Sequence, residues 1–306
     1  MKFSSLLIVI TLILVSCNRS STQNSLTVFS AAAMTPVLEE IRKSNSNNLN
    51  ILVEFSGSQV ACRKIAEFGR QADLIISADK NLFELILKNH VSFRIDFACD
   101  EVVLGVGRFA KFADKAEKDP FLTILNEDVK LARVNENLAP IGYMTLFSCM
   151  LAERLNKEKL GLLDALKKKS NYITDDVMSL IPYLKTGQVD YCFIFKSACI
   201  ANDIRFISLP KSCNLSNLKT DYSCVELVDI PKKGLSLKGG PALFSLSIPD
   251  ESKKKAEAVQ LIKSLCSAEL LYEKGFTPLN PPRFFGDFSL YKEYFANFAE
   301  YKGKYF

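Results

Sequence analysis

The sequence predicts an α/β fold, and three observations support this prediction. Short runs rich in β-branched residues alternate with amphipathic stretches along the chain, which is the pattern of strands separated by helices. Hydrophobic residues make up 48% of the 306 residues, enough for a large core and too many for a disordered chain. Helix signals fall between the runs, such as Thr35-Pro36 at an expected helix start and Gly187 at an expected helix end.

The first hundred residues follow this alternation. Gly57-Ser58 begins a helical stretch, and Gly69 ends it because glycine readily adopts the left-handed conformation that stops a helix. The expected strands are 26–29, 49–55, 74–77 and 101–106, and the expected helices are 35–42, 57–68 and 81–88.

The rest of the chain repeats the pattern. Pro140-Ile141-Gly142 leads into a long helix, and a loop with two cysteines follows Pro210. The expected helices are 121–125, 143–155, 177–186, 252–266 and 267–275, and the expected strands are 129–133, 189–195, 206–209, 224–228 and 242–248. In the aromatic tail, Tyr291, Phe295 and Phe298 share one helical face. This face would either dock a partner or pack on its own lobe.

The N-terminus carries a targeting signal. One lysine is followed by an uncharged apolar run from Phe3 to Ser16, which is typical of a signal peptide and short for a membrane span. The run ends in Leu14-Val15-Ser16-Cys17, which resembles a bacterial lipobox. We therefore expect a signal peptide at 1–16, lipidation at Cys17 and a flexible tether at 17–25. An ordinary signal peptide with an incidental cysteine is the alternative.

Composition excludes several function classes. The net charge of +5 is spread along the chain without the clustered basic stripe of a nucleic-acid surface. The chain has nine cysteines without a C-x-x-C pair and a single histidine, His90, which argues against zinc, haem or a histidine-dependent triad. An exported chain permits disulfides, and Cys213 with Cys224 is the first pair to test. The cysteines inside apolar runs are expected to be core residues.

Four loops share a feature that indicates anion binding. Each leads into a helix, whose first N–H groups are unpaired and carry partial positive charge. Small residues there would let an anion approach the backbone, although such turns are common wherever a strand precedes a helix. The loops are Ser30 to Met34, Ser56-Gly57-Ser58, Ala139 to Gly142, and Asp175-Asp176-Val177.

These segments resemble the periplasmic proteins that bind molybdate or tungstate for ABC importers. The matching segments run in order from Leu26 to Arg283, and the last resembles the tungstate-binding branch. They are 26–35, Gly57-Ser58, Arg63-Lys64, 69–79, Phe97-Ala98, Val102 to Leu104, Pro140 to Tyr143, Gly187 to Tyr191, Phe195 to Ser197, and Pro278 to Arg283.

The resemblance implies a two-lobed periplasmic-binding-protein fold of type II, the Venus-flytrap fold, with a central mixed sheet in each lobe. It implies one lobe at 26–103 plus 210–306 and the other at 104–209. A molybdate or tungstate oxyanion would bind as a ligand, with no cofactor and no directly bound metal. The implied partners are a membrane permease and its ATPase. We expect an exported, lipid-anchored monomer that faces the periplasm or the exterior and binds no nucleic acid.

The resemblance also implies five ligand-binding residues. Ser58 matches a serine that donates to the anion, while Ile141 and Val177 match positions that donate a backbone N–H. Ala33 and Phe195 fall where relatives have a serine and a tyrosine, so two hydroxyls are missing here. The two carboxylates that complete an octahedral shell in the archaeal tungstate branch are replaced by Ala139 and Val177, which predicts tetrahedral binding.

Three other functions remain open. The missing hydroxyls could indicate the same fold with another oxyanion or a small organic anion. An enzyme on a two-lobed scaffold would need a nucleophile beside a base, and the helix-start loops offer serines without histidine, so we expect no catalysis. An adhesion or structural lipoprotein would leave the four loops unexplained.

Overall fold

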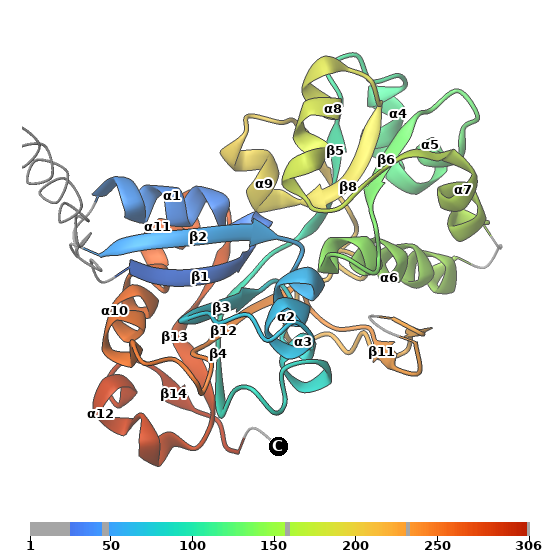
Figure 1. Cartoon of the computed structure of the whole chain (residues 1–306). Helices are drawn as coiled ribbons and strands as arrows, with labels where there is room; N and C mark the ends of the chain where they lie inside the picture. Colours follow the sequence, from blue (N-terminus) through green and yellow to red (C-terminus); the bar gives the residue numbers. More distant parts are fainter. Residues whose placement is uncertain (1–24, 45–48, 157–159, 231–232, 305–306) are drawn as a thin grey trace, which may run out of the picture.

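The chain folds into two lobes, each built on its own sheet (Figure 1). The computed structural model describes residues 25–44, 49–156, 160–230 and 233–304. The predicted signal peptide, the lipidation site Cys17 and the tether up to residue 24 lie outside the described residues, and Ser25 already begins the first strand. Within the described ranges, no helix is long and apolar enough to cross a membrane.

The first lobe contains a seven-stranded mixed sheet. In spatial order the strands are β14 (Glu300–Tyr301), β13 (Thr277–Gly286), β4 (Phe93–Cys99), β12 (Leu243–Ser247), β3 (Leu74–Ser77), β1 (Ser25–Ala31) and β2 (Asn50–Ser56). Strand β1 pairs in parallel with β2 and β3, whereas β12 runs antiparallel to β3 and β4. The helices are η1 (Ala32–Met34), α1 (Thr35–Ser44), α2 (Ser58–Ala66), α3 (Asn81–Leu85), α10 (Lys255–Leu265), α11 (Ala268–Glu273), η3 (Phe288–Leu290) and α12 (Lys292–Phe295).

The second lobe contains a five-stranded mixed sheet. The strand order is β7 (Ser170–Thr174), β6 (Leu131–Val134), β8 (Tyr191–Phe195), β5 (Val102–Val106) and β9 (Phe206–Ser208). Strand β6 runs parallel to β7 and β8, and β5 runs antiparallel to β8 and β9. The helices are α4 (Ala113–Lys118), α5 (Pro120–Leu125), α6 (Pro140–Leu155), α7 (Leu162–Lys169), η2 (Met178–Leu180), α8 (Ile181–Thr186) and α9 (Lys196–Ala201). A separate hairpin joins β10 (Glu226–Val228) and β11 (Ser236–Lys238).

The mixed sheets in two lobes confirm the predicted fold class. Central strands β3, β4, β5, β8 and β12 are buried along their whole length. This burial on both faces explains why β3, β5 and β8 consist almost entirely of apolar residues.

The chain first crosses between the lobes at Asp100 and Glu101. Val102 and Val103 already pair with Phe195 and Ile194 of the second sheet. The expected boundary after residue 103 therefore falls inside β5, a few residues later than the crossing in the structure. The return to the first lobe follows β9, the last strand of the second sheet along the chain.

The aromatic tail packs on its own lobe. The rings of Tyr291 and Phe295 are buried and lie 4.4 and 6.1 Å from the ring of Phe93. These are residues of the face that the sequence indicated, and in the structure they pack into the core of the first lobe. This contact agrees with the expectation that the tail packs on its own lobe, and not with the alternative that it docks a partner.

The cysteines of the described residues are all free thiols. Cys213 is buried and Cys224 is exposed, so the pair singled out in the sequence is not bonded in this structure. The others are buried, as expected of small core residues.

Candidate functional site

A small cavity lies where the two lobes meet. Its walls come from strand ends and helix starts of both lobes, and none of the described Lys or Arg side chains lines it. The lining residues are Ala31, Ala32, Ala33, Ser56, Gly57, Ser58, Ala78, Ala139, Pro140, Ile141, Asp176, Val177 and Phe195.

All five residues predicted to bind a ligand line this cavity. Ala33 and Ser58 come from the first lobe, and Ile141, Val177 and Phe195 come from the second. None is more than 3% exposed. The fold thus brings together four loops that are far apart in the sequence.

The cavity is nearly closed. The space that a water-sized sphere can occupy is about 10 Å³, which is room for about one water molecule. Gly57 permits this close approach, because a Cβ at this position would lie 2.1 Å from the carbonyl oxygen of Leu138 in the other lobe. Any larger residue at position 57 would push the lobes apart.

Helix α6 presents backbone N–H groups at the cavity. Ala139 is the N-cap and Pro140 occupies the first turn, where its missing N–H costs nothing. The Gly142 N–H donates to the Ala139 carbonyl at 2.9 Å. The Ile141 N–H lies in the first turn, which has no intrahelical acceptor for it, so it is suited to an external acceptor.

Ser58 supplies a side-chain hydroxyl. It is the first residue of α2, and its Oγ accepts a hydrogen bond from the Ala78 N–H at 3.0 Å. Because this bond uses a lone pair, the hydroxyl hydrogen is left to donate elsewhere. The bond to Ala78 also fixes the oxygen beside the cavity.

Phe195 forms an aromatic wall that reaches the other lobe. Its ring meets Phe244 of β12 edge to face with the centroids 5.6 Å apart, and Phe244 meets Phe276 at 5.1 Å. With an alanine at position 33 on the opposite lobe, this side of the cavity is apolar.

Asp176 also lines the cavity, next to Val177. Its Oδ1 accepts from the Ser179 N–H at 3.0 Å, the usual role of an aspartate that caps a helix. The sequence placed Asp176 in a helix-start loop but did not assign it to the cavity wall.

Two hydrogen bonds cross the cleft beside the cavity. The Tyr143 hydroxyl in α6 donates to Asp79 Oδ2 at 2.5 Å, and Gln59 Nε2 in α2 donates to the Glu136 carbonyl at 2.9 Å. The sequence gave none of these residues a function, because the pairing depends on how the lobes meet. Tyr143 and Asp79 did lie within the matched segments.

Burial determines the protonation chemistry of the first pair. Desolvation raises the pKa of Asp79, and the hydrogen bonds from Tyr143 and the Asn81 N–H oppose this rise. Desolvation also raises the pKa of the Tyr143 phenol well above its ordinary value, so the phenol stays a donor.

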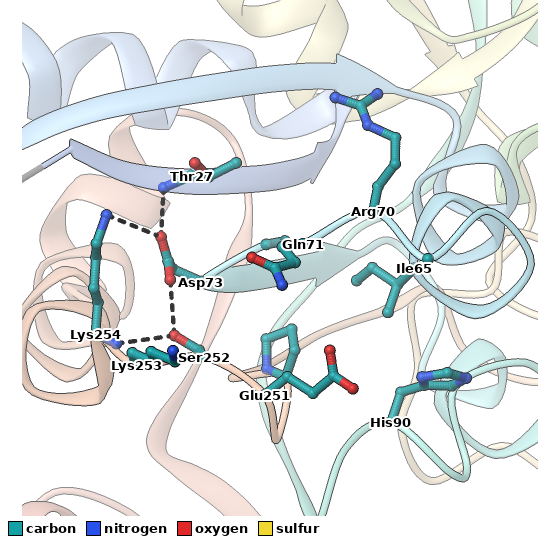
Figure 2. Close-up of a pocket in the computed structure, with 13 residues that line it drawn as sticks. Thr27, Ile65, Arg70, Gln71, Asp73, His90, Glu251, Ser252, Lys253 and Lys254 are labelled. Atoms are coloured by element: carbon teal, nitrogen blue, oxygen red, sulfur yellow. Dashed lines mark hydrogen bonds and ion pairs between the residues drawn. The ribbon is translucent and has the colours of Figure 1, made fainter.

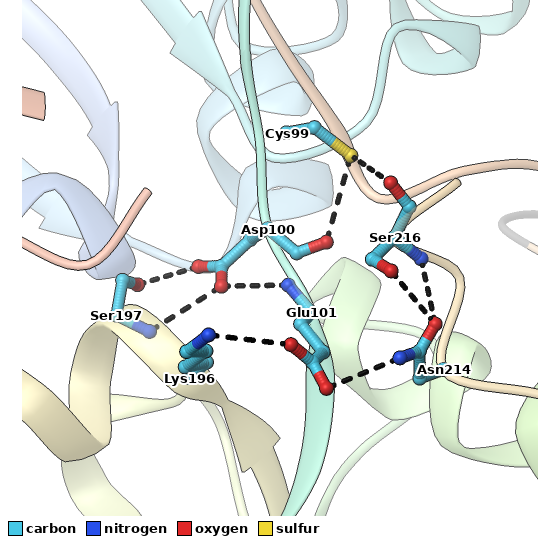
Figure 3. Close-up of polar contacts among 7 residues, drawn as sticks. All are labelled: Cys99, Asp100, Glu101, Lys196, Ser197, Asn214 and Ser216. Atoms are coloured by element: carbon cyan, nitrogen blue, oxygen red, sulfur yellow. Dashed lines mark hydrogen bonds and ion pairs between the residues drawn. The ribbon is translucent and has the colours of Figure 1, made fainter. Parts of the chain in front are cut away.

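A second polar network holds the two crossing segments together (Figure 3). Asp100 accepts from the Ser197 Oγ at 2.5 Å and the Ser197 N–H at 3.3 Å, while Glu101 accepts from Asn214 Nδ2 at 3.1 Å. Lys196 Nζ lies 3.5 Å from Glu101. Desolvation raises the pKa of Asp100 to about 7, against the opposing hydrogen bonds from Ser197.

A more spacious recess beside charged residues lies elsewhere, on the first lobe (Figure 2). It measures about 330 Å³, and none of the five predicted residues lines it. Asp73 in its wall is already satisfied, since it accepts from the Thr27 N–H at 2.9 Å and Ser252 Oγ at 2.8 Å. Across the described chain, no group of three His, Cys, Asp or Glu residues is placed to hold a metal ion.

The chain is similar to curated solute-binding proteins over most of its length. The model of the bacterial extracellular solute-binding protein family matches residues 26–271. An uncharacterised solute-binding protein of Petrotoga mobilis is 28% identical, with 83% of this chain and 84% of that protein covered. A molybdate/tungstate-binding protein of Thermococcus kodakarensis is 25% identical, with 88% and 86% covered.

Solved structures share the fold. The periplasmic molybdate-binding protein of Azotobacter vinelandii has a TM-score of 0.57 at 16% identity, covering 82% of this chain and 98% of that one. The sulfate-binding protein of Mycobacterium tuberculosis has a TM-score of 0.60 at 12% identity, covering 92% and 93%. These proteins are binding proteins rather than enzymes, and their anion is a ligand rather than a cofactor. The chain belongs to the bacterial extracellular solute-binding protein family.

Proposed function

We propose that this chain is the binding component of an ABC importer and captures molybdate or tungstate in the interlobe cavity. The observation that carries the proposal is that four helix-start loops meet at one cavity without Lys or Arg. Helix-start N–H groups, including that of Ile141, and the Ser58 hydroxyl would donate to the oxyanion. The names of the Thermococcus and Azotobacter proteins support this ligand class.

A bound oxyanion would widen the cavity slightly while the lobes stay closed around it. Four oxygens around a metal need more room than the one water molecule that fits the cavity. We propose that the lobes, at about 26–100 with 210–306 and 101–209, move around the crossing at Asp100 and Glu101. The monomer with the anion enclosed would dock on the permease, which the ATPase drives.

Calorimetry on the purified mature chain tests the ligand. Molybdate, tungstate, sulfate and phosphate would be titrated separately at equal ionic strength. We expect saturable heat with molybdate or tungstate at one site per chain and much weaker heat with phosphate. An absence of binding by both metal oxyanions would refute this ligand assignment.

A different anion on the same fold is the second candidate. Ala33 and Phe195 carry no hydroxyl, so the cavity has fewer donors than the resemblance implies. The similar fold of a sulfate-binding protein shows that such folds are compatible with another oxyanion. Saturable heat with sulfate or a small organic anion, and none with the metal oxyanions, would favour this candidate.

We also propose that the chain is exported and anchored by lipid at Cys17. The uncharged run that ends in Leu14-Val15-Ser16-Cys17 motivates this step. Mass spectrometry of the N-terminal peptide from membranes should show an acylated cysteine, and Cys17→Ser should release the protein from the membrane fraction. An unmodified N-terminal peptide that begins before Cys17 would contradict it.

A further inference from the structure

We infer that the hydrogen bond between Tyr143 and Asp79 is a latch that holds the cleft closed and thereby increases ligand affinity. This inference rests on the proposed function. Tyr143 belongs to α6 of the second lobe, and Asp79 follows β3 of the first lobe. Their oxygens lie 2.5 Å apart, and both residues are at most 2% exposed.

The latch lies beside the cavity but outside its wall. Ala78 and Ile141 line the cavity, and they precede Asp79 by one residue and Tyr143 by two. Neither Tyr143 nor Asp79 lines the cavity itself. The pair is therefore placed to act on closure rather than by touching the ligand.

Hydrogen bonds within the first lobe hold Asp79 in position for this contact. Asp79 Oδ1 accepts from the Asn81 N–H at 2.9 Å, and its backbone N–H donates to Ser77 Oγ at 3.0 Å. These bonds form inside one lobe and survive opening. They leave Oδ2 for the hydroxyl that arrives with the other lobe.

Closure without this hydroxyl would bury an acceptor that lacks a partner. A buried oxygen that loses its donor costs more than a neutral hydrogen bond gains. Opening returns both groups to water, where each is satisfied. The bond therefore stabilises the closed form alone, and a ligand that needs the closed form binds more tightly when the bond can form.

Matched variants separate this role from ordinary stability. Tyr143→Phe removes the hydroxyl that crosses the cleft. Tyr191→Phe removes a buried hydroxyl that donates to the Lys111 carbonyl within the second lobe. Asp79→Asn keeps an oxygen for the Asn81 N–H and offers its amide to the Tyr143 oxygen, so it should preserve the latch.

Calorimetry with molybdate and tungstate, together with small-angle X-ray scattering of the ligand-free chain, tests the latch. Tyr143→Phe should weaken affinity about tenfold and give a larger radius of gyration. Tyr191→Phe and Asp79→Asn should stay within about threefold of the unmodified chain. If Tyr143→Phe does not fold, Asp79→Ala removes the other partner and should show the same two effects.

Unchanged affinity and unchanged scattering in Tyr143→Phe would overturn the latch. Equal weakening in Tyr191→Phe would also overturn it, because the loss would then reflect general destabilisation. If the unmodified chain binds neither metal oxyanion, the proposed function fails separately. In that case the radii of gyration of the ligand-free variants still test whether the bond holds the cleft closed.

Discussion

Two buried aspartates receive the same hydrogen bond in different parts of the molecule. Asp79 and Asp100 are each 2% exposed, and each accepts from a hydroxyl at 2.5 Å. The Asp79 bond crosses the cleft and must break when the lobes separate. The Asp100 bond lies at the crossing around which the lobes would move, so it can persist in both forms. Loss of the bond at Asp79 should therefore lower the affinity for the ligand, whereas loss of the bond at Asp100 should change the folding stability of the chain.

The largest expected effect concerns the pH dependence of stability through Asp100. Burial raises its pKa to about 7 in the folded chain from the ordinary 3.8. The folded state therefore binds more protons than the unfolded state between these values, and the free energy of unfolding falls as pH rises from about 4 to about 7. The fall approaches about 1.4 kcal/mol per pH unit.

Chemical denaturation at several pH values measures this fall. Asp100→Asn cannot titrate, so its stability should lack this contribution. Ser197→Ala keeps the carboxylate but removes a bond that lowers its pKa, which should extend the fall to higher pH. Identical pH profiles for the unmodified chain and Asp100→Asn would contradict the assignment.

Gly57→Val should abolish closure while leaving both lobes folded. Its Cβ would meet the Leu138 carbonyl oxygen, so the cleft could not reach the form seen here. We expect affinity to fall by about a hundredfold or more, as closure-dependent contacts are lost together. Gly240→Ala is the control, since its Cβ would meet no atom closer than 4.0 Å. Calorimetry that gives equal affinities for both variants would rule out a close approach at position 57.

Ser58→Ala should weaken anion binding about tenfold, the loss of one hydrogen bond to a charged ligand. The Ala78 N–H would also lose its acceptor. Ser30→Ala changes another buried serine of the first lobe that lies outside the cavity wall, and it should bind as the unmodified chain does. Equal affinity of Ser58→Ala and the unmodified chain, measured by calorimetry, would remove Ser58 from the proposed site.

Ala33→Ser should have the smallest effect and the opposite sign. It returns one donor to the apolar side of the cavity, which we expect to increase affinity by a few fold. Competition calorimetry can resolve such a gain. A loss of affinity would indicate that the added oxygen crowds the closed cavity.

The fold class and the cavity wall were predictable because they depend on local order. Strands followed directly by helices place helix starts at strand ends, so Ala33, Ser58, Ile141, Val177 and Phe195 could meet once the lobes faced each other. The contact between Tyr143 and Asp79 was not predictable, because it depends on how one lobe seats on the other.

Several elements were missed, among them strand β4, helix α4, the α7–β7 segment and strand β13. In the α7–β7 segment, Leu162 and Leu166 have helical spacing, but the helix is only 8 residues long and ends in the lysine run at 167–169. Strand β13 carries Pro278, Pro281 and Pro282, and proline normally argues against a strand because it lacks an N–H. The structure tolerates them because the pairing with β4 shifts register between Pro278 and Arg283.

Native mass spectrometry of the purified mature chain can show whether the closed interlobe cavity captures a metal oxyanion. The protein would be incubated with molybdate, tungstate or sulfate and compared with Gly57→Val. We expect one metal oxyanion per chain in the unmodified protein and none in Gly57→Val. No mass increase with either metal oxyanion, or an equal increase in both proteins, would contradict capture in the closed interlobe cavity.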